Sequence, residues 1–343
     1  MNVDERIAAQ ARRDGPLGYD QVVEIALYDG ELGFYETGGA AGRGGDFLTS
    51  PEVGPLFGAV LARAFDSCWR ELGEPSSFTV VEAGAGRGVL AKAVLAAAPA
   101  CAPALRYVAV ERSGALRAQH PDGVESADVL PAEPFVGVIL ANELLDNVPF
   151  GLLERRENGW AEVRVDEHVK EMLVPVADVA ESRLTPDAPV GGRIPIQRAA
   201  HAWVETALGL VLRGRVIVID YADTTPSLVR RPWAEWVRTY RAHGRGTHPL
   251  ADLGDQDITC EVAVDQLPAA TSNRSQAEFL REHGIDELAD EARREWEERA
   301  HIGDLQALKS RSRVHEAAAL TDRVGLGAFR ALEWVIPPAA QGV

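Results

Sequence analysis

The segment over residues 78–90 constrains the fold of this chain more than any other. It reads Phe-Thr-Val-Val-Glu-Ala-Gly-Ala-Gly-Arg-Gly-Val-Leu, so a β-branched run ends in an acid and meets three closely spaced glycines before a helix-forming stretch. This order predicts a strand, a tight turn and the start of a helix. Such a turn lets the backbone approach a nucleotide-like ligand, because glycine has no Cβ to block it. An ordinary glycine-rich turn without a ligand is the simpler alternative. The neighbouring residues decide between these two interpretations.

The spacing of Gly84, Gly86 and Gly88 argues against a dinucleotide site. The fingerprint G-x-G-x-x-G needs its third glycine where this chain has Val89. Glu82 also precedes the glycines, and its carboxylate would repel a pyrophosphate while suiting a ligand with an ammonium or sulfonium group. S-adenosylmethionine is such a ligand, since it has an amino acid end and a positive sulfur but no phosphate. We therefore expect this cofactor and rank a nicotinamide-dependent oxidoreductase below a methyltransferase.

A second acid follows the next predicted strand. Residues 105–111 read as a strand that ends in Glu111, whose carboxylate we expect to accept hydrogen bonds from both ribose hydroxyls of the cofactor. Farther along, residues 125–128 end in Asp128, which we expect beside the adenine ring. A strand, an E-x-G-x-G-x-G turn, a helix and a strand ending in Glu form the pattern of a class I methyltransferase.

A third strand end carries the candidate catalytic groups. An apolar run over residues 135–141 leads into Asn142 and Glu143, then Asp146, before Pro149 closes the turn. In a doubly wound fold the carboxyl end of such a strand faces the ligand crevice. We predict that Asn142 contacts the cofactor and that Glu143 and Asp146 face one pocket as catalytic carboxylates. A plain surface turn is the alternative.

The composition excludes several classes of function. With 343 residues, 46% hydrophobic and 25% charged, the chain can form one large domain or a domain with a long insertion. The net charge of −17 argues against binding to nucleic acid or anionic membranes, since phosphate contacts need Lys and Arg. The three cysteines have neither zinc-site nor disulfide spacing, so we expect reduced thiols and no metal. The first residues lack the apolar stretch of a signal peptide, which leads us to expect a cytoplasmic protein.

Periodicity and turn signals predict further elements. Six glycines between Gly33 and Gly45 indicate a lid loop or a linker, and Thr49-Ser50-Pro51 predicts the start of the helix that follows it. Asn158-Gly159 between alternating residues predicts a β-hairpin. We also expect helices over residues 3–13, 19–27, 53–72 and 227–242, an irregular stretch up to residue 195, and a charged helical segment over 275–320.

Four stretches together resemble the MidA-like class I methyltransferases, a family that includes a mitochondrial complex I assembly factor that methylates protein arginine. The stretches are residues 44–52 (Gly-Gly-Asp-Phe-Leu-Thr-Ser-Pro-Glu), 82–88 (Glu-Ala-Gly-Ala-Gly-Arg-Gly), 141–149 (Ala-Asn-Glu-Leu-Leu-Asp-Asn-Val-Pro) and 218–221 (Val-Ile-Asp-Tyr). Weaker similarities at residues 239–243, 257–259 and 325–329 extend the resemblance over nearly the whole chain. The chain departs from its relatives at Ala83, Ala85 and Ala222, where they often have a bulkier residue, proline and glycine, respectively.

The resemblance implies an α/β fold with a Rossmann-like core, whose seven-stranded sheet is mostly parallel with an antiparallel last strand. We place N-terminal helices and the lid at residues 1–75, the core at 76–225 and 305–340, and a mainly helical substrate-side region at 226–304. By position, the glycine turn and Glu111 would hold S-adenosylmethionine, and Thr49, Ser50 and Pro51 would close over it.

The family also implies in-line methyl transfer to an acceptor nitrogen, such as that of a protein arginine. A guanidinium has no free lone pair, so nearby carboxylates would orient it and accept its proton. A donor-binding or non-catalytic assembly protein and a small-molecule N- or O-methyltransferase are the alternatives. The sequence does not name the acceptor, and a homodimer is one assembly that it allows.

Overall fold

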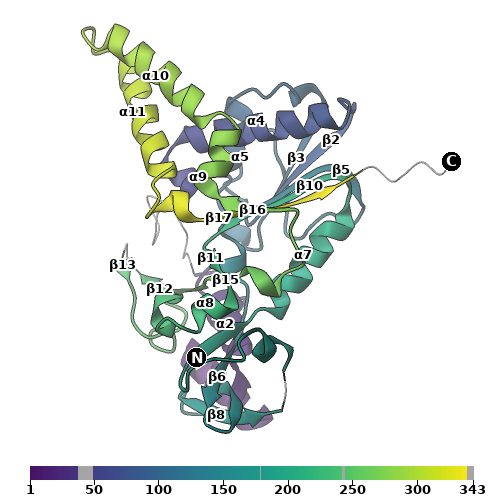
Figure 1. Cartoon of the computed structure of the whole chain (residues 1–343), viewed down its shortest axis with the longest axis vertical. Helices are drawn as coiled ribbons and strands as arrows, with labels where there is room; N and C mark the ends of the chain where they lie inside the picture. The colour runs from purple at the N-terminus through teal and green to yellow at the C-terminus, as the bar shows by residue number, and fades with distance from the viewer. Residues whose placement is uncertain (38–48, 178, 242–243, 338–343) are drawn as a thin grey trace, which may run out of the picture. The chain divides into compact units, whose positions relative to one another are not determined.

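The computed structural model describes residues 1–37, 49–177, 179–241 and 244–337 (Figure 1). The chain forms two compact units. We call residues 48–143, 207–219 and 270–343 the core unit, and residues 1–47, 144–206 and 220–269 the second unit. The greater part of the predicted lid loop, His243 and the last predicted core residues lie outside the described residues.

The core unit is built on a seven-stranded sheet with the strand order β16-β17-β10-β5-β2-β3-β4. The neighbours from β10 to β4 run parallel, whereas β16 and β17 pair antiparallel. This confirms the predicted mostly parallel α/β sheet. Every residue of β2 is buried, as expected for a parallel strand covered on both faces. The strands are β2 (Phe78–Ala83), β3 (Leu105–Val110), β4 (Glu125–Ala127), β5 (Phe135–Asn142), β10 (Val211–Asp220), β16 (Ser272–Ser275) and β17 (Arg330–Ile336).

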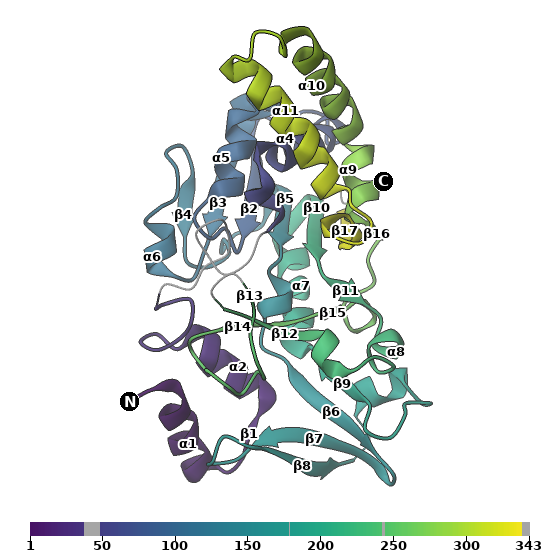
Figure 2. The ribbon, with the colours of Figure 1, turned by 90° about the vertical axis from the view of Figure 1, so that its left-hand side faces the viewer.

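Helices of the core unit include two antiparallel neighbours, α10 and α11, which form a hairpin (Figures 1 and 2). Helix α4 packs against α5 and also contacts α11. The bounds are α3 (Ser50–Val53), α4 (Pro55–Glu71), α5 (Val89–Ala96), α6 (Gly114–Arg117), α9 (Gln276–Glu282), α10 (Ile285–Arg299) and α11 (Leu305–Leu320). Helix α7 (Arg198–Leu210) continues from the second unit into the core unit. No helix in the described part of the chain is long and apolar enough to cross a membrane.

The helix predicted over residues 53–72 is broken at Gly54. This residue is extended, with φ 163° and ψ −179°, and the long helix α4 begins at Pro55. Glu316 of α11 explains the break, because its Oε2 accepts a hydrogen bond from the amide of Leu56 at 3.0 Å and so caps the new helix. A Cβ on Gly54 would lie 2.2 Å from the carboxyl carbon of Glu316.

The second unit contains mainly short antiparallel strands. One sheet has the order β1-β7-β6-β9, with β8 also paired to β7. Two smaller sheets join β13-β12-β14 and β11-β15. The bounds are α1 (Val3–Asp14), β1 (Leu17–Gly18), α2 (Tyr19–Tyr28), β6 (Gly151–Arg156), β7 (Gly159–Val165), β8 (Glu171–Val176), β9 (Arg193–Ile196), β11 (Ala222–Asp223), α8 (Thr225–Leu228), β12 (Val237–Arg241), β13 (Gly244–Arg245), β14 (Asp257–Cys260) and β15 (Val262–Ala263).

The structure of the second unit can be compared with several of the predictions made from the sequence. The hairpin around Asn158-Gly159 is confirmed as β6 and β7. The stretch expected to be irregular contains β8 and β9, and the expected helix over 227–242 is wrong because Val237–Arg241 pairs with β14 as a strand. The unit boundaries also differ from the predicted division, since residues 144–206 fold with the N-terminal helices and residues 270–304 belong to the core unit, which takes β16 from them.

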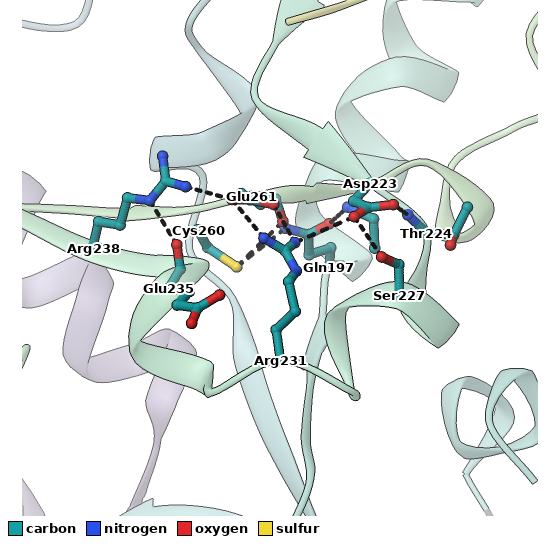
Figure 3. A network of polar contacts seen from close by, with 10 residues as sticks. Gln197, Asp223, Thr224, Ser227, Arg231, Glu235, Arg238, Cys260 and Glu261 are labelled. Atoms are coloured by element: carbon teal, nitrogen blue, oxygen red, sulfur yellow. Dashed lines mark hydrogen bonds and ion pairs between the residues drawn. The ribbon is translucent and has the colours of Figure 1, made fainter. Parts of the chain in front are cut away.

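Glu261 joins distant parts of the second unit through a polar network (Figure 3). Its Oε2 accepts a hydrogen bond from Arg231 at 2.5 Å, and its Oε1 accepts one from Arg238 at 2.6 Å. Its backbone carbonyl accepts a hydrogen bond from the side chain of Gln197 at 3.0 Å, and Arg231 also approaches Asp223 at 3.3 Å. Because the Glu261 side chain is nearly buried, these partners offset the cost of removing it from water.

We expect Gly137→Ala to destabilise the protein by ~3 kcal/mol or more, measured by chemical denaturation. Gly137 in β5 has φ +153°, and a Cβ there would lie 1.8 Å from the carbonyl oxygen of Thr79 in β2. The two central strands would have to separate. Gly209→Ala is the control, since its Cβ would meet nothing within 4 Å inside α7 and should change stability by ~1 kcal/mol at most, in the stabilising direction. Wild-type stability in Gly137→Ala would contradict this account.

Candidate functional site

Parallel pairing brings four strand ends into one row of the core sheet. Ala83 of β2 lies opposite Val110 of β3 and Ala141 of β5, and Val110 lies opposite Ala127 of β4. The residues that come next along the chain therefore share one edge: Gly84, Glu111, Asn142 and Asp128. Ligands of open α/β sheets bind outside the carboxyl ends of the strands. The sheet thus gathers site residues that were predicted from four separate segments.

The glycine turn after β2 needs glycine for two different reasons. The φ angle is +70° at Gly84, +53° at Gly86 and +74° at Gly88, a region that other residues rarely adopt. A Cβ at Gly88 would also lie 2.6 Å from the ring of Pro121, so this glycine is required for packing. A Cβ at Gly86 would meet nothing within 4 Å. The open space beside Gly86 is a cradle of the kind that a nucleoside cofactor needs.

Glu111 holds the glycine turn from the neighbouring strand. Its Oε2 accepts a hydrogen bond from the amide of Gly86 at 3.0 Å, and its Oε1 accepts one from the amide of Ser113 at 2.9 Å. Burial raises the pKa of this carboxyl, and the two amides partly oppose that rise. Each carboxylate oxygen has a further lone pair, so ribose hydroxyls can still donate to Glu111. Its contact with ribose stays a prediction.

Glu82 is buried between β3 and α5 and is only 4% exposed. Its Oε2 accepts a hydrogen bond from the hydroxyl of Tyr107 at 2.7 Å. Burial raises the pKa of Glu82 to about 7, while the Tyr107 hydroxyl opposes the rise. We expected this carboxylate to face a positively charged group of the cofactor. In the structure its carboxyl group is held by Tyr107 inside the core unit, so its contact with the cofactor stays a prediction.

His120 supports the turn and was not found from the sequence. Its Nε2 lies 3.0 Å from the carbonyl oxygen of Gly86, and its Nδ1 lies 2.9 Å from the hydroxyl of Ser126. Because a carbonyl only accepts, we assign the proton to Nε2, which leaves Nδ1 to accept from Ser126. Tyr107 was missed for the same reason as His120: an isolated aromatic or histidine gives no pattern until the fold shows its neighbour.

Glu143 is the most unusual residue at this edge. Its φ is +51°, a conformation that costs free energy in a residue other than glycine and that concentrates at functional sites. Its Oε1 accepts hydrogen bonds from the amide of Ser50 at 3.0 Å and from the side chain of Asn142 at 3.1 Å. Its Oε2 is buried and has no hydrogen-bond partner among the described residues. Burial raises the pKa of Glu143 to about 7.

The remaining predicted site residues lie as follows. Thr49, Ser50 and Pro51 form the start of α3, which the structure brings to Glu143 through the Ser50 amide; their closure over the cofactor stays a prediction. Asp128 is exposed directly after β4. Asp146 lies in the second unit, within a short 3₁₀ helix (Leu145–Asn147), and its amide donates to Asp220 at 3.3 Å. The sharing of one pocket by Glu143 and Asp146 therefore also stays a prediction.

Metal ligands do not gather in the described ranges. No group of three or more His, Cys, Asp or Glu side chains within them could hold a metal ion. The three cysteines are free and buried.

Fold and site together define a class I, S-adenosylmethionine-dependent methyltransferase. The chain belongs to the family described as putative S-adenosyl-L-methionine-dependent methyltransferases, whose model matches residues 60–282. This confirms the family, fold class and cofactor that the sequence indicates.

Two solved structures from Burkholderia thailandensis are similar over almost the whole chain. One is a likely methyl transferase bound to S-adenosyl-homocysteine, with a TM-score of 0.81 and 28% identity over 97% of this chain and 92% of its own. The other, the native structure of an uncharacterized protein, has a TM-score of 0.78 and 26% identity over 99% and 94%. The bound S-adenosyl-homocysteine belongs to the first of these proteins.

Curated relatives bear the name protein arginine methyltransferase NDUFAF7, mitochondrial. The protein from Rattus norvegicus is 24% identical over 79% of this chain and 72% of its own length. The homolog from Drosophila melanogaster is 37% identical over 91 residues, which cover 26% of this chain and 21% of the relative. The protein from Danio rerio is 28% identical over 47% of this chain and 46% of its own. The chain thus spans about a fifth and about half of the lengths of the latter two.

We expect Gly86→Ala to weaken binding of S-adenosyl-homocysteine at least about tenfold, measured by calorimetry, because the added methyl group fills the open space at the turn. Stability should fall by only ~1–2 kcal/mol, since nothing packs against this position. Gly123→Ala is the matched control: φ there is +86°, so the backbone strain is similar, but the residue lies outside the glycine turn. Equal affinities of the two variants would remove Gly86 from the cofactor site.

The pKa of Glu82 predicts a pH dependence of stability. The folded pKa of about 7 exceeds the ordinary value of 4.5, so the folded protein holds this proton more tightly than the unfolded chain does. The stabilisation is complete below the unfolded pKa and is lost as pH rises through 7. We expect the free energy of unfolding to fall less in Glu82→Gln than in the wild type between pH ~5 and ~8, by on the order of 2–3 kcal/mol. Parallel denaturation curves across this range would show that Glu82 does not titrate as described.

Proposed function

We propose that this protein transfers a methyl group from S-adenosylmethionine to a guanidinium nitrogen of an arginine in another protein. The name shared by the curated relatives supports the arginine acceptor. The acidic character of the chain, with a net charge of −17, supports a basic protein segment as the partner. The cofactor supplies an activated methyl group, and the residues of the chain supply its binding and the handling of the acceptor.

One observation carries the proposal: a carboxylate oxygen of Glu143 is left unused at the strand end next to the glycine turn. β5 pairs with β2, so Asn142 and Glu143 follow directly after the residue opposite Ala83. Ser50 and Asn142 occupy Oε1, whereas Oε2 is buried and lacks a partner in the described chain. An unsatisfied buried oxygen is costly, and such groups are concentrated where a ligand completes them. Asn142 Oδ1 is in the same situation.

The chemistry of arginine fits this arrangement. A guanidinium is protonated at neutral pH and has no free lone pair, so nitrogen methylation requires a group that orients it and takes up the released proton. A carboxylate does both, and a pKa of about 7 makes Glu143 a more effective base at neutral pH than an ordinary glutamate. We assign proton acceptance to Glu143, and Asp146 is the second carboxylate that we propose for orienting the acceptor.

We expect Glu143→Gln to lower kcat at least 100-fold while the dissociation constant for S-adenosylmethionine changes less than about threefold. In the wild type the rate should rise with pH and level off above about 7, since Glu143 must be ionised to accept the proton. Transfer of labelled methyl groups to the proteins of a cell extract, followed by hydrolysis and identification of the methylated amino acid, measures the rate and its pH dependence, and calorimetry measures the dissociation constant. Glu133→Gln, an exposed glutamate before β5, is the control.

Three outcomes would contradict the proposal. Label in a small molecule rather than in protein would indicate a small-molecule methyltransferase. Cofactor binding without transfer would indicate a non-catalytic assembly protein. Full activity of Glu143→Gln would show that another group accepts the proton.

A further inference from the structure

Two buried side chains of the core unit connect Glu143 to the helical segment at residues 276–320. The amide of Ser50 donates to Glu143 Oε1 at 3.0 Å, and the hydroxyl of Ser50 donates to Gln276 Oε1 at 3.1 Å. At the other end of its amide group, Gln276 Nε2 donates to the carbonyl of Leu320, the last residue of α11, at 3.2 Å. Ser50 and Gln276 are both 0% exposed. A continuous chain of hydrogen bonds thus runs from α11 to the candidate base.

The orientation of Gln276 is fixed at every polar atom. Its backbone amide donates to the carbonyl of Phe329 at 2.7 Å, and it is the first residue of α9, whose N-terminus carries a capping box formed by Ser275 and Glu278. Its side-chain nitrogen donates to the Leu320 carbonyl, which only accepts, so a flip of the amide would place two oxygens together and lose this hydrogen bond. Gln276 is therefore built to hold Ser50 in one position.

A second contact from α11 holds the same segment from its other side. Glu316 is 5% exposed; its Oε2 accepts a hydrogen bond from the amide of Leu56, and its Oε1 accepts one from the hydroxyl of Ser312, each at 3.0 Å. The short helix Ser50–Val53 lies between these two anchors in sequence. Ser50, its first residue, is connected to α9 and α11 through Gln276. Leu56, which follows the break at Gly54, is connected to α11 through Glu316.

We propose that Gln276 is a positioning residue for methyl transfer: it holds Ser50, whose amide holds Glu143 Oε1 and so leaves Oε2 for the acceptor. This inference rests on the function proposed above for Glu143. It makes the charged helical segment part of the catalytic apparatus, because α9 and α11 supply the far end of the hydrogen-bond chain. Displacing a reacting group by ~1 Å is enough to lower a rate by about 100-fold, so a remote glutamine can act strongly on turnover.

The test uses the full-length protein and the variants Gln276→Leu and Ser50→Ala. Each should lower kcat about tenfold or more, and Gln276→Leu should leave the dissociation constant for S-adenosylmethionine within about threefold of the wild type. Because both substitutions break one chain of contacts, the double variant should be no more than about twofold slower than the slower single variant. Gln306→Leu is the control, since this glutamine is exposed on α11 and its side chain donates a hydrogen bond to Glu295.

Two readouts separate positioning from general damage to the fold. Backbone hydrogen exchange over residues 49–56, measured without cofactor, should speed up in both variants and not in Gln306→Leu, because the hydrogen bond between Ser50 Oγ and Gln276 no longer holds this segment in place. The acidic limb of the pH–rate profile should move to higher pH, because the Ser50 amide favours the ionised form of Glu143.

The outcomes distinguish this inference from the proposed function. Loss of activity in Glu143→Gln, together with wild-type rates and exchange in Gln276→Leu, would overturn the inference alone. If the losses of kcat in the two single variants multiply in the double variant, the inference is also overturned, since the two substitutions then act independently. The same holds if cofactor binding by Gln276→Leu weakens as much as its kcat falls, since this indicates general structural damage. Full activity in Glu143→Gln would overturn the proposed function itself.

Discussion

The register of the parallel strands is the constraint on which the rest of the core unit depends. Ala83 lies opposite Val110 on one side and Ala141 on the other, so the acid-led glycine turn, Glu111 and the Asn142-Glu143 pair come to one edge. Side chains alternate between the two faces of a strand, so a slip of one residue in β5 would turn Asn142, its last residue, to the opposite face of the sheet and would displace Glu143 after it. The site is thus specified by the hydrogen bonds of the sheet interior before any of its own contacts form.

Burying carboxyl groups at this edge of the sheet costs free energy, because a buried carboxylate loses its hydration. Glu82 and Glu143 both have a raised pKa because burial disfavours their charge. The hydroxyl of Tyr107 donates to Glu82 Oε2 and offsets part of the cost of burying this carboxyl group. Glu143 has a left-handed backbone conformation and an oxygen without a partner in the described chain, and both features are concentrated at functional sites. The two glutamates therefore differ in their partners: Glu82 Oε2 accepts a hydrogen bond from Tyr107, whereas Glu143 Oε2 has no hydrogen-bond partner among the described residues.

The sequence predicts what is local and misses what is distant. The strand–glycine–helix unit at residues 78–90 could be recognised because its signals, β-branched residues, an acid and glycines, are adjacent in sequence. The break at Gly54 could not, because the residue that causes it, Glu316, lies far along the chain. Residues 237–241 were misread for the same reason, since their pairing with β14 outweighs a weak helical spacing. His120 and Gln276 likewise become meaningful only when the fold brings them to Gly86 and Ser50.

The two units are interleaved along the chain, and this has a consequence for biosynthesis. Strand β10 (Val211–Asp220) has β5 on one side and β17 (Arg330–Ile336) on the other, and β17 is synthesised only after residues 221–329. Until then β10 presents an unpaired strand edge, which is a template for intermolecular pairing. The strands of the sheet therefore cannot all pair with their neighbours in the order in which they are synthesised. Formation of the complete sheet therefore depends on a pairing between segments distant in sequence, which slows folding, and removal of β17 should favour aggregation through the exposed edge of β10.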